Sequence, residues 1–139
     1  MIIDYYKSDE FKQLKTLVDA TFDTDINEDI IENIYTKGNH FIITASLDEK
    51  IVGCAFVEKR EDHIRNKKDF FVSYVAVDPT IRNHGIGRKL FDKIRAIALK
   101  NDIHSIELTS ANYRTGAHKF YEKIGFAKKK TTIFIDDQF

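Results

Sequence analysis

The chain has 139 residues, 42% of them hydrophobic, and its 22 Lys and Arg residues balance its 22 Asp and Glu residues. This length suits one domain with a single core. A formal net charge of zero argues against a nucleic-acid-binding protein, which would usually be basic.

The chain contains no repeat, no low-complexity tract and no long apolar stretch typical of a signal peptide or a transmembrane helix. We therefore expect one continuous domain over residues 1–139, in the cytoplasm, with no membrane partner. Cys54 is the only cysteine, which excludes an internal disulfide, and its apolar neighbours from Ile51 to Val57 favour a place in the core.

The N-terminal part of the chain predicts a strand followed by two helices. Ile2 to Tyr5 forms the strand, and Ser8 is a candidate cap for a helix that runs to about Phe22. Apolar residues at helical spacing predict the buried face of that helix: Phe11, Leu14, Leu17 and Val18. Asn27 is a candidate cap for the second helix, Glu28 to Thr36, which ends near Gly38.

Two apolar runs, His40 to Leu47 and Ile51 to Lys59, predict a hairpin of antiparallel strands around a tight turn at residues 48–50. The charged stretch from Arg60 to Lys68 predicts a loop. The chain then returns as a long strand, Asp69 to Val77.

The C-terminal half predicts a strand between two helices and a final pair of strands. Apolar residues spaced by four predict a helix from Ile86 to Lys100, with its buried face at Ile86, Leu90, Ile94 and Ala98. A short strand, Ile103 to Leu108, would be parallel to the strand before that helix. The remaining predicted elements are a helix from Thr115 to Ile124, ended by Gly125, and strands at Phe126–Lys128 and Thr131–Asp136.

The most informative feature is a basic, glycine-containing turn between a predicted strand and a predicted helix. It consists of Arg82, Asn83, His84, Gly85, Ile86, Gly87 and Arg88. The first turn of a helix has free N–H groups and the positive end of the helix dipole. Glycines let the backbone approach an anion closely, and arginine suits phosphate oxygens. The turn therefore predicts a site for a phosphorylated ligand, with a pyrophosphate as the expected group.

The spacing of the turn distinguishes among phosphate-binding motifs. No Walker A spacing occurs, and Leu90 stands where a dinucleotide fingerprint needs its third glycine. Arg-x-x-Gly-x-Gly after an apolar strand that ends in Val75-Ala76-Val77 resembles the acetyl-CoA loop of the GNAT N-acetyltransferase family.

A second segment, from Asn112 to Phe126, is similar to the closing motif of the same family. There, an asparagine precedes a helix that ends in Phe-Tyr, here Phe120-Tyr121, and a Gly-Phe turn leads to the next strand. The resemblance is close from Phe70 to Phe126 and looser over the rest of the chain.

The resemblance implies an α+β fold, the GNAT fold. Its mixed central sheet would have about seven strands, with helices on both faces. Two parallel central strands would separate near a bulge and leave a V-shaped cleft for acetyl-CoA.

The resemblance also implies a role for each motif residue. Residues 82–88 would hold the pyrophosphate, with His84 facing solvent or the adenosine end. The backbone of Val75, Ala76 and Val77 would pair with the pantetheine amides, as an added strand would. Asn112 would hydrogen-bond the pantetheine, and Phe120 would pack on the cofactor or the core.

Tyr121 is the candidate catalytic residue. Acyl transfer from a thioester to an amine expels a thiolate, which a nearby phenol can protonate. For each of these residues a structural role is the alternative: a strand-to-helix turn at 82–88, a loop asparagine at 112, and a buried aromatic at 121.

The general base is not evident from the sequence. Many relatives carry a glutamate on the strand before the glycine turn, but Phe71 and Ser73 stand at the comparable positions. Four residues remain as candidates, directly or through water: Glu107, Glu58, Asp69 and His63. An amine that is partly neutral would need only solvent as its proton acceptor, and positioning would then drive the reaction.

Other charged residues point to no further partner. The five histidines lack paired metal-ligand spacing, so no metal is expected. The run Lys128 to Lys130 is typical of a solvated turn. The acidic residues Asp23, Asp25, Glu28 and Asp29 either attract a cationic amine or, as we favour, stabilise a helix N-terminus.

We expect an acetyl-CoA-dependent N-acetyltransferase in which a primary amine attacks the thioester directly. The acceptor, a small molecule or a protein amine, is not indicated by the sequence. The alternative is a non-catalytic acyl-CoA-binding sensor or interaction module, which the absent glutamate favours. Relatives often dimerise through terminal strands, so a homodimer also stays open.

Overall fold

The computed structural model describes residues 1–81 and 84–139, so the predictions for Arg82 and Asn83 lie outside the described residues. The chain divides into two compact units, Met1–Thr109 and Ser110–Phe139. Each unit is described by itself.

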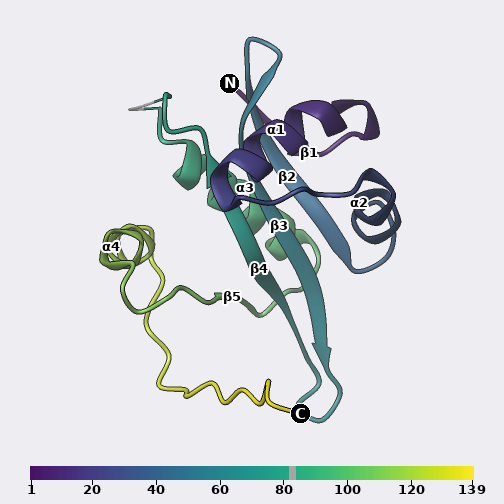
Figure 1. The fold of residues 1–139 in the computed structure, drawn as a ribbon. Helices are drawn as coiled ribbons and strands as arrows, with labels where there is room; N and C mark the ends of the chain where they lie inside the picture. The colour runs from purple at the N-terminus through teal and green to yellow at the C-terminus, as the bar shows by residue number, and fades with distance from the viewer. Residues whose placement is uncertain (82–83) are drawn as a thin grey trace. The chain divides into compact units, whose positions relative to one another are not determined.

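The first unit contains a five-stranded sheet in the order β1-β2-β3-β4-β5. Its strands are β1 (Ile2–Tyr5), β2 (His40–Leu47), β3 (Lys50–Asp62), β4 (Lys67–Val77) and β5 (Ser105–Leu108). The first four strands pair antiparallel, whereas β5 is parallel to β4. Figure 1 labels these strands. The sheet is mixed, as predicted.

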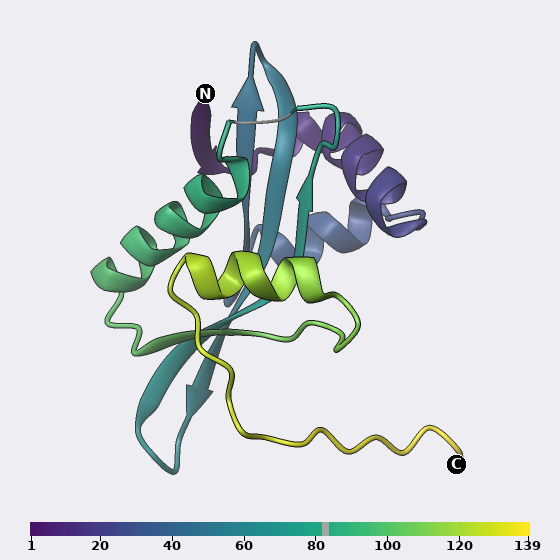
Figure 2. The same cartoon turned by 90° about the vertical axis from the view of Figure 1, so that its left-hand side faces the viewer.

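Helices cover both faces of this sheet (Figure 2). Cys54 on β3 belongs to a buried cluster that includes residues of α1 (Phe11–Phe22) and α2 (Glu28–Tyr35). Its neighbour Gly53 faces Ile86 and Leu90 of α3 (Ile86–Lys100) instead. Because successive strand residues point to opposite faces, α1 and α2 lie on one face and α3 on the other.

The predicted helix faces are buried as expected. Those residues are Phe11, Leu14, Leu17 and Val18 of α1 and Ile86, Leu90, Ile94 and Ala98 of α3. Asn27 caps α2, since its Oδ1 accepts a hydrogen bond from the Ile30 amide at 3.0 Å. The prediction for Ser8 is wrong: a short 3₁₀ turn, Ser8–Glu10, precedes α1, and the Ser8 hydroxyl donates to Glu32 instead.

The predicted loop from Arg60 to Lys68 is also wrong. β3 and β4 continue through most of it, and a turn occupies only residues 63–66. Oppositely charged residues face each other across this part of the ladder: Arg60 and Asp69, Glu61 and Lys68, and Asp62 and Lys67. Such cross-strand pairs stabilise a sheet without hydrophobic side chains, so the charged stretch is strand.

The second unit contains one helix, α4 (Thr115–Lys123), which Gly125 follows at a φ of 105°. The two final strands predicted at 126–128 and 131–136 are absent from this unit, all of whose residues are described. The sheet therefore has five strands rather than about seven. Strand propensity alone does not form a strand, because each strand needs a hydrogen-bonded partner.

Candidate active site

The hydrogen-bonded ladders on the two edges of β4 both change at Val72–Ser73. The parallel ladder with β5 runs from Asp69 to Val72 and stops there. On the other edge, Phe56 pairs with Tyr74 and Val57 with Val72, so Ser73 is the extra residue of a β-bulge. β4 continues from Ser73 to Val77 beyond the ladder with β5. No strand of the described residues pairs with this edge of β4 from Ser73 to Val77, so an extended ligand could pair there.

The turn after β4 begins with a hydrogen-bonded aspartate. Asp78 Oδ1 accepts hydrogen bonds from the amide and hydroxyl of Thr80, at 2.9 and 2.7 Å. These hydrogen bonds hold the pKa of the Asp78 carboxyl below its usual range. The Asp78 amide donates to the Val52 carbonyl at 2.8 Å, which fixes the end of β4 to β3.

Helix α3 begins at a glycine in the left-handed conformation. Gly85 is the N-cap, with φ 62° and ψ 35°, and no side chain among the described residues caps the helix there. Gly87 and Arg88 lie in the first turn, while Ile86 is buried and anchors it. Within the described part of the chain, the amides of this turn thus have no capping side chain, and such amides suit a phosphate.

Gly53 positions this helix, a role that the sequence analysis did not assign. A Cβ atom on Gly53 would lie 2.6 Å from Cγ2 of Ile86. The absence of a side chain thus lets the first turn of α3 approach β3 closely. A glycine inside an apolar strand is the signal that could have identified it.

A groove of about 690 Å³ lies between α1 and the end of β4, on the face that α1 covers. Val77, Asp78 and Pro79 line one side, and the β2–β3 turn closes one end. Gln13 of α1 holds that turn, because its Oε1 accepts from the Ile51 amide at 2.7 Å and its Nε2 donates to the Glu49 carbonyl at 3.2 Å.

The closing motif lies in the second unit. Asn112 is exposed in the segment before α4. His118 approaches this segment, with its Nε2 3.0 Å from the carbonyl oxygen of Ala111. In α4, the rings of Phe120 and Tyr121 meet edge to face at 5.5 Å, and Phe126 packs on Tyr121 at 6.0 Å.

Tyr121 is half-buried, and burial raises the pKa of its phenol, although the positive charge of Arg114 acts in the opposite direction. A raised pKa keeps the phenol protonated at neutral pH. The side chain is therefore in the form that can donate a proton.

Two of the four candidate bases share one arginine. Arg60 donates to both oxygens of Asp69 at 3.0 Å, and its Nη2 lies 3.6 Å from Oε1 of Glu107. Its guanidinium also covers the ring of Phe71 at 4.7 Å. Asp69 and Glu107 are thus held in an ion-pair cluster, which favours a structural role for both.

The other two candidate bases differ in position. His63 is exposed and lies in the turn between β3 and β4. Glu58 lies on β3, between His40 of β2 and Phe71 of β4 in the sheet register.

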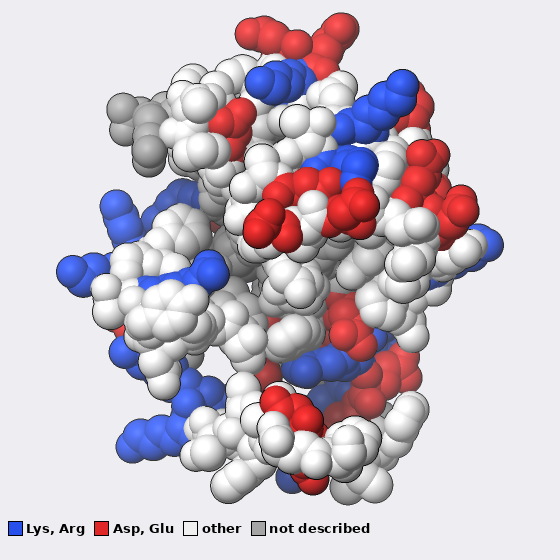
Figure 3. Space-filling model, in the orientation of Figure 1, with Lys and Arg blue, Asp and Glu red and all other residues white. Residues whose placement is uncertain are grey.

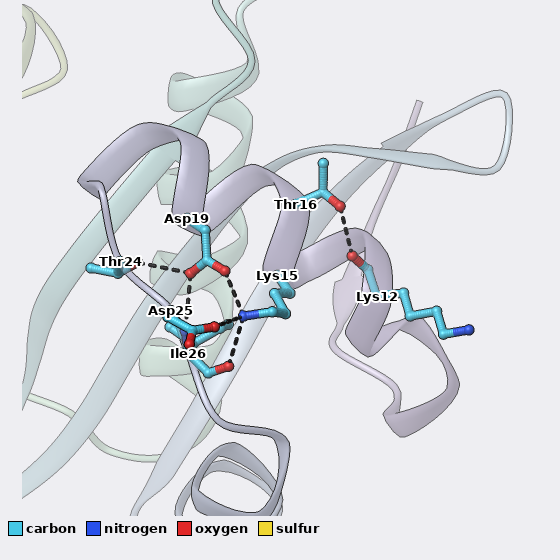
Figure 4. A network of polar contacts seen from close by, with 7 residues as sticks. All are labelled: Lys12, Lys15, Thr16, Asp19, Thr24, Asp25 and Ile26. Carbon is cyan, nitrogen blue, oxygen red and sulfur yellow. Dashed lines mark hydrogen bonds and ion pairs between the residues drawn. The ribbon is translucent and has the colours of Figure 1, made fainter.

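The acidic stretch after α1 is partly engaged by one lysine (Figure 4). Lys15 Nζ donates to Asp19 Oδ2 at 2.7 Å, to Asp25, and to the Ile26 carbonyl at 3.1 Å. Its ammonium lowers the pKa of Asp19. Glu28 and Asp29 lie in the first turn of α2, where negative charge stabilises the helix.

Cys54 is buried, and burial raises the pKa of its thiol to about 12, so it is a core residue. No group of His, Cys, Asp or Glu suited to a metal ion occurs among the described residues. Within the same residues, no helix has the length and hydropathy needed to cross a bilayer.

Acidic and basic side chains are interspersed over α1 and α2 on the face in Figure 3.

The described residues contain a mixed sheet, a bulged strand whose ladder with β5 stops at Val72, and a helix that begins at a glycine. The family model for the acetyltransferase (GNAT) family matches residues 3–126. The chain belongs to this family of acyl-transferring enzymes, which favours an N-acetyltransferase over the sensor alternative.

Curated relatives agree with the family over part of their length. An N-acetylaspartate synthetase from Danio rerio is 29% identical over 119 residues, which is 84% of this chain and 40% of the relative. The same enzyme from Xenopus tropicalis is 32% identical over 106 residues, 74% of this chain and 36% of the relative. The chain thus spans well under half the length of these relatives.

Solved structures share the fold at low sequence identity. An aminoglycoside acetyltransferase from an uncultured soil metagenomic sample superposes with a TM-score of 0.86 and 20% identity, covering 97% of this chain and 94% of its own. An aminoglycoside N-acetyltransferase, AAC(6')-Iy, in complex with CoA also gives a TM-score of 0.86, at 16% identity, covering 99% and 94%.

Proposed function

We propose that residues 1–139 form one acetyl-CoA-dependent N-acetyltransferase domain that transfers an acetyl group to a primary amine. The observation that carries this proposal is the change in β4 at Ser73, where the strand leaves its ladder with β5 and continues toward the glycine cap of α3. The CoA complex of a protein with the same fold supports the choice of ligand. We place the protein in the cytoplasm, where acetyl-CoA is available.

In this proposal, the main chain of Val75 to Val77 pairs with the pantetheine amides and polarises the thioester carbonyl. The turn from Arg82 to Arg88 binds the pyrophosphate. Asn112 and Phe120 contact the pantetheine arm, and Tyr121 protonates the leaving thiolate.

The reaction needs no covalent enzyme intermediate. The amine lone pair forms the N–C bond, the C–S bond breaks, and its electron pair stays on sulfur. An ammonium substrate loses one proton before it attacks and a second as the amide forms, and sulfur gains one. The acceptor amine is to be identified by experiment.

The test combines binding and turnover. Calorimetric titration with acetyl-CoA measures binding, and release of free CoA thiol is then followed with a panel of polyamines, amino acids, aminoglycosides and peptide N-termini. We expect binding together with thiol release on at least one amine. Binding without turnover on the whole panel would contradict the enzyme and favour a sensor.

A further inference from the structure

A group of polar side chains lies beside the bulge of β4, on the face that α1 and α2 cover. Ser73 is exposed, and its hydroxyl donates to the Phe56 carbonyl at 3.4 Å. The ring of Tyr35, the last residue of α2, packs edge to face on Phe56 at 5.1 Å. The Ser73 hydroxyl is close enough to the Tyr35 phenol to lower the pKa of that phenol, although burial outweighs this effect. The two hydroxyls thus lie close together, one at the bulge and one on α2.

The chain of polar groups continues toward β2. The imidazole of His40 meets the Tyr35 ring edge to face at 5.6 Å. His40 and Glu58 lie directly opposite each other in the β2–β3 ladder, so their side chains project from the same face as neighbours. All four side chains, Ser73, Tyr35, His40 and Glu58, belong to the first unit.

The bulge gives Ser73 its position at the start of this chain. In the β3–β4 register, no residue of β3 lies opposite Ser73. Ser73 also lies one residue beyond Val72, the last β4 residue paired with β5. Bulges re-aim a side chain and often lie beside active sites. Ser73 is therefore the β4 side chain at the start of the open edge, where the proposed thioester would bind.

The carboxylates bound by Arg60 are less suited to proton transfer than the side chains around Ser73. Asp69 and Glu107 are both held by ion pairs with Arg60. Tyr35 and Ser73 carry hydroxyls that both donate and accept, and the imidazole of His40 can take up and release a proton. Burial raises the pKa of Tyr35, and Glu58 adds to this effect while the Ser73 hydroxyl opposes it. The phenol thus stays neutral and can pass a proton on.

We propose that Ser73, Tyr35 and the His40–Glu58 pair form the path by which the acceptor ammonium loses its proton, in place of the strand glutamate. This inference rests on the proposed acetyltransferase function. The ammonium proton passes to Ser73 Oγ as the Ser73 proton moves to Tyr35 Oη. The Tyr35 proton then passes through water to the His40 imidazole, where the Glu58 carboxylate faces the imidazolium. His40 finally releases this proton to solvent, and the free amine attacks the thioester.

The pH dependence expected of this path reflects the ionisable neighbours on the same face. Those groups are Tyr35 from α2, Glu58 and Arg60 from β3, Asp69 and Tyr74 from β4, and Glu107 from β5. Arg60 is already paired with Asp69, so Glu58 is the carboxylate directly opposite His40.

The test follows CoA release from about pH 5.5 to 9, with the panel amine that reacts fastest. The variants are Tyr35→Phe, Ser73→Ala, Ser73→Thr and His40→Gln. Matched controls are Tyr6→Phe, which removes a hydroxyl bonded to Glu32 at 3.1 Å, and His104→Gln, whose ring lies near Lys68. Acetyl-CoA affinity and the melting temperature are measured for each variant.

We expect Tyr35→Phe and Ser73→Ala to lower kcat/KM by about 100-fold or more, with acetyl-CoA affinity unchanged. Ser73→Thr keeps most activity because it keeps the hydroxyl. His40→Gln loses the acidic limb of the pH profile, which both controls retain.

Wild-type kcat/KM in Tyr35→Phe, or an unchanged acidic limb in His40→Gln, would overturn the path and leave the acetyltransferase intact. A matching loss of acetyl-CoA binding or melting temperature would also overturn it, by showing a structural role. If the wild-type chain binds acetyl-CoA but acetylates no amine, the proposed function itself fails, and the path fails with it.

Discussion

The two halves of β4 differ in how their backbone groups are paired. From Asp69 to Val72 the strand is hydrogen-bonded to β3 on one edge and to β5 on the other. After the bulge, from Ser73 to Val77, the ladder with β5 has ended while the pairing with β3 resumes. The first half is stabilised by strands on both of its edges. On the side of β5, the second half has no strand partner among the described residues. One strand thus combines a fully paired half with a half that we propose as the binding edge for acetyl-CoA.

The side chains follow the same division. The paired half carries the Arg60–Asp69–Glu107 cluster, in which every charge has a partner. The open half carries hydroxyl and aromatic groups at Ser73 and Tyr74 and ends at Val77. We therefore expect substitutions in the paired half to change stability and those around the open half to change binding or turnover.

The largest expected effect is on turnover and comes from loss of the Tyr121 phenol. The backbone of the open half cannot protonate the CoA thiolate, so the proposed mechanism needs this side chain. Tyr121→Phe removes the phenol that we assign to the thiolate, so we expect kcat to fall by about 100-fold or more with little change in acetyl-CoA affinity. Tyr113→Phe, at an exposed tyrosine of the same unit, is the control. Near-normal turnover in Tyr121→Phe would remove Tyr121 from the mechanism.

The next largest effect is expected at Gly53, which lets the first turn of α3 approach β3. Gly53→Ala places a Cβ atom against Ile86, so we expect the free energy of unfolding to fall by about 1–3 kcal/mol and acetyl-CoA to bind more weakly. Urea unfolding and calorimetry measure the two quantities. Gly116→Ala is the control, because a Cβ there would meet no atom within 4 Å. Equal acetyl-CoA affinity in Gly53→Ala and wild type would refute the role of Gly53.

In the paired half, Arg60→Met should reduce the free energy of unfolding by about 1 kcal/mol and leave acetyl-CoA affinity unchanged. The expected loss is small because the Arg60 side chain is 38% exposed. Arg65→Met, which removes a more exposed pair with Asp62, should have a smaller effect. A strong loss of acetyl-CoA affinity in Arg60→Met would break the distinction between the two halves.

The smallest effect lies at Asp78, where the open half ends. Hydrogen bonds from Thr80 lower the pKa of this carboxyl in the folded state, so the charged form is favoured by folding. Its contribution to stability is present above the ordinary carboxyl pKa and is lost as the pH falls through the lowered value. The difference in urea midpoint between wild type and Asp78→Asn should therefore shrink on acidification. If the difference in urea midpoint grew at low pH, the charged form of Asp78 would not be the stabilising one.

Hydrophobic spacing predicted the parts of the fold in which one face is buried. The spacing by four in α3 and the apolar run of β2 gave their bounds, because burial of one face imposes the helix or strand period. The same reasoning failed between Arg60 and Lys68, where opposite charges facing across the hairpin replace hydrophobic residues. It also failed at residues 131–136, because strand propensity cannot reveal whether a partner strand is available.

The candidate site was predictable where it depends on local backbone geometry. The glycine turn indicated that a helix begins at Ile86, and the structure has this helix with Gly85 as its N-cap. The bulge at Ser73 was not predictable at that residue, because it arises from the register between β3 and β4. The grouping of Tyr35, His40 and Ser73 also depends on three separate elements, so no local pattern in the sequence indicates it.

The most direct test of where acetyl-CoA binds is amide hydrogen exchange measured residue by residue, with and without saturating acetyl-CoA. If acetyl-CoA pairs with the open half of β4, exchange slows at Ser73–Val77 and at Gly85–Arg88, while Lys67–Val72 stays unchanged because its ladders already protect it. Protection confined to other residues, or no change at saturation, would contradict the account.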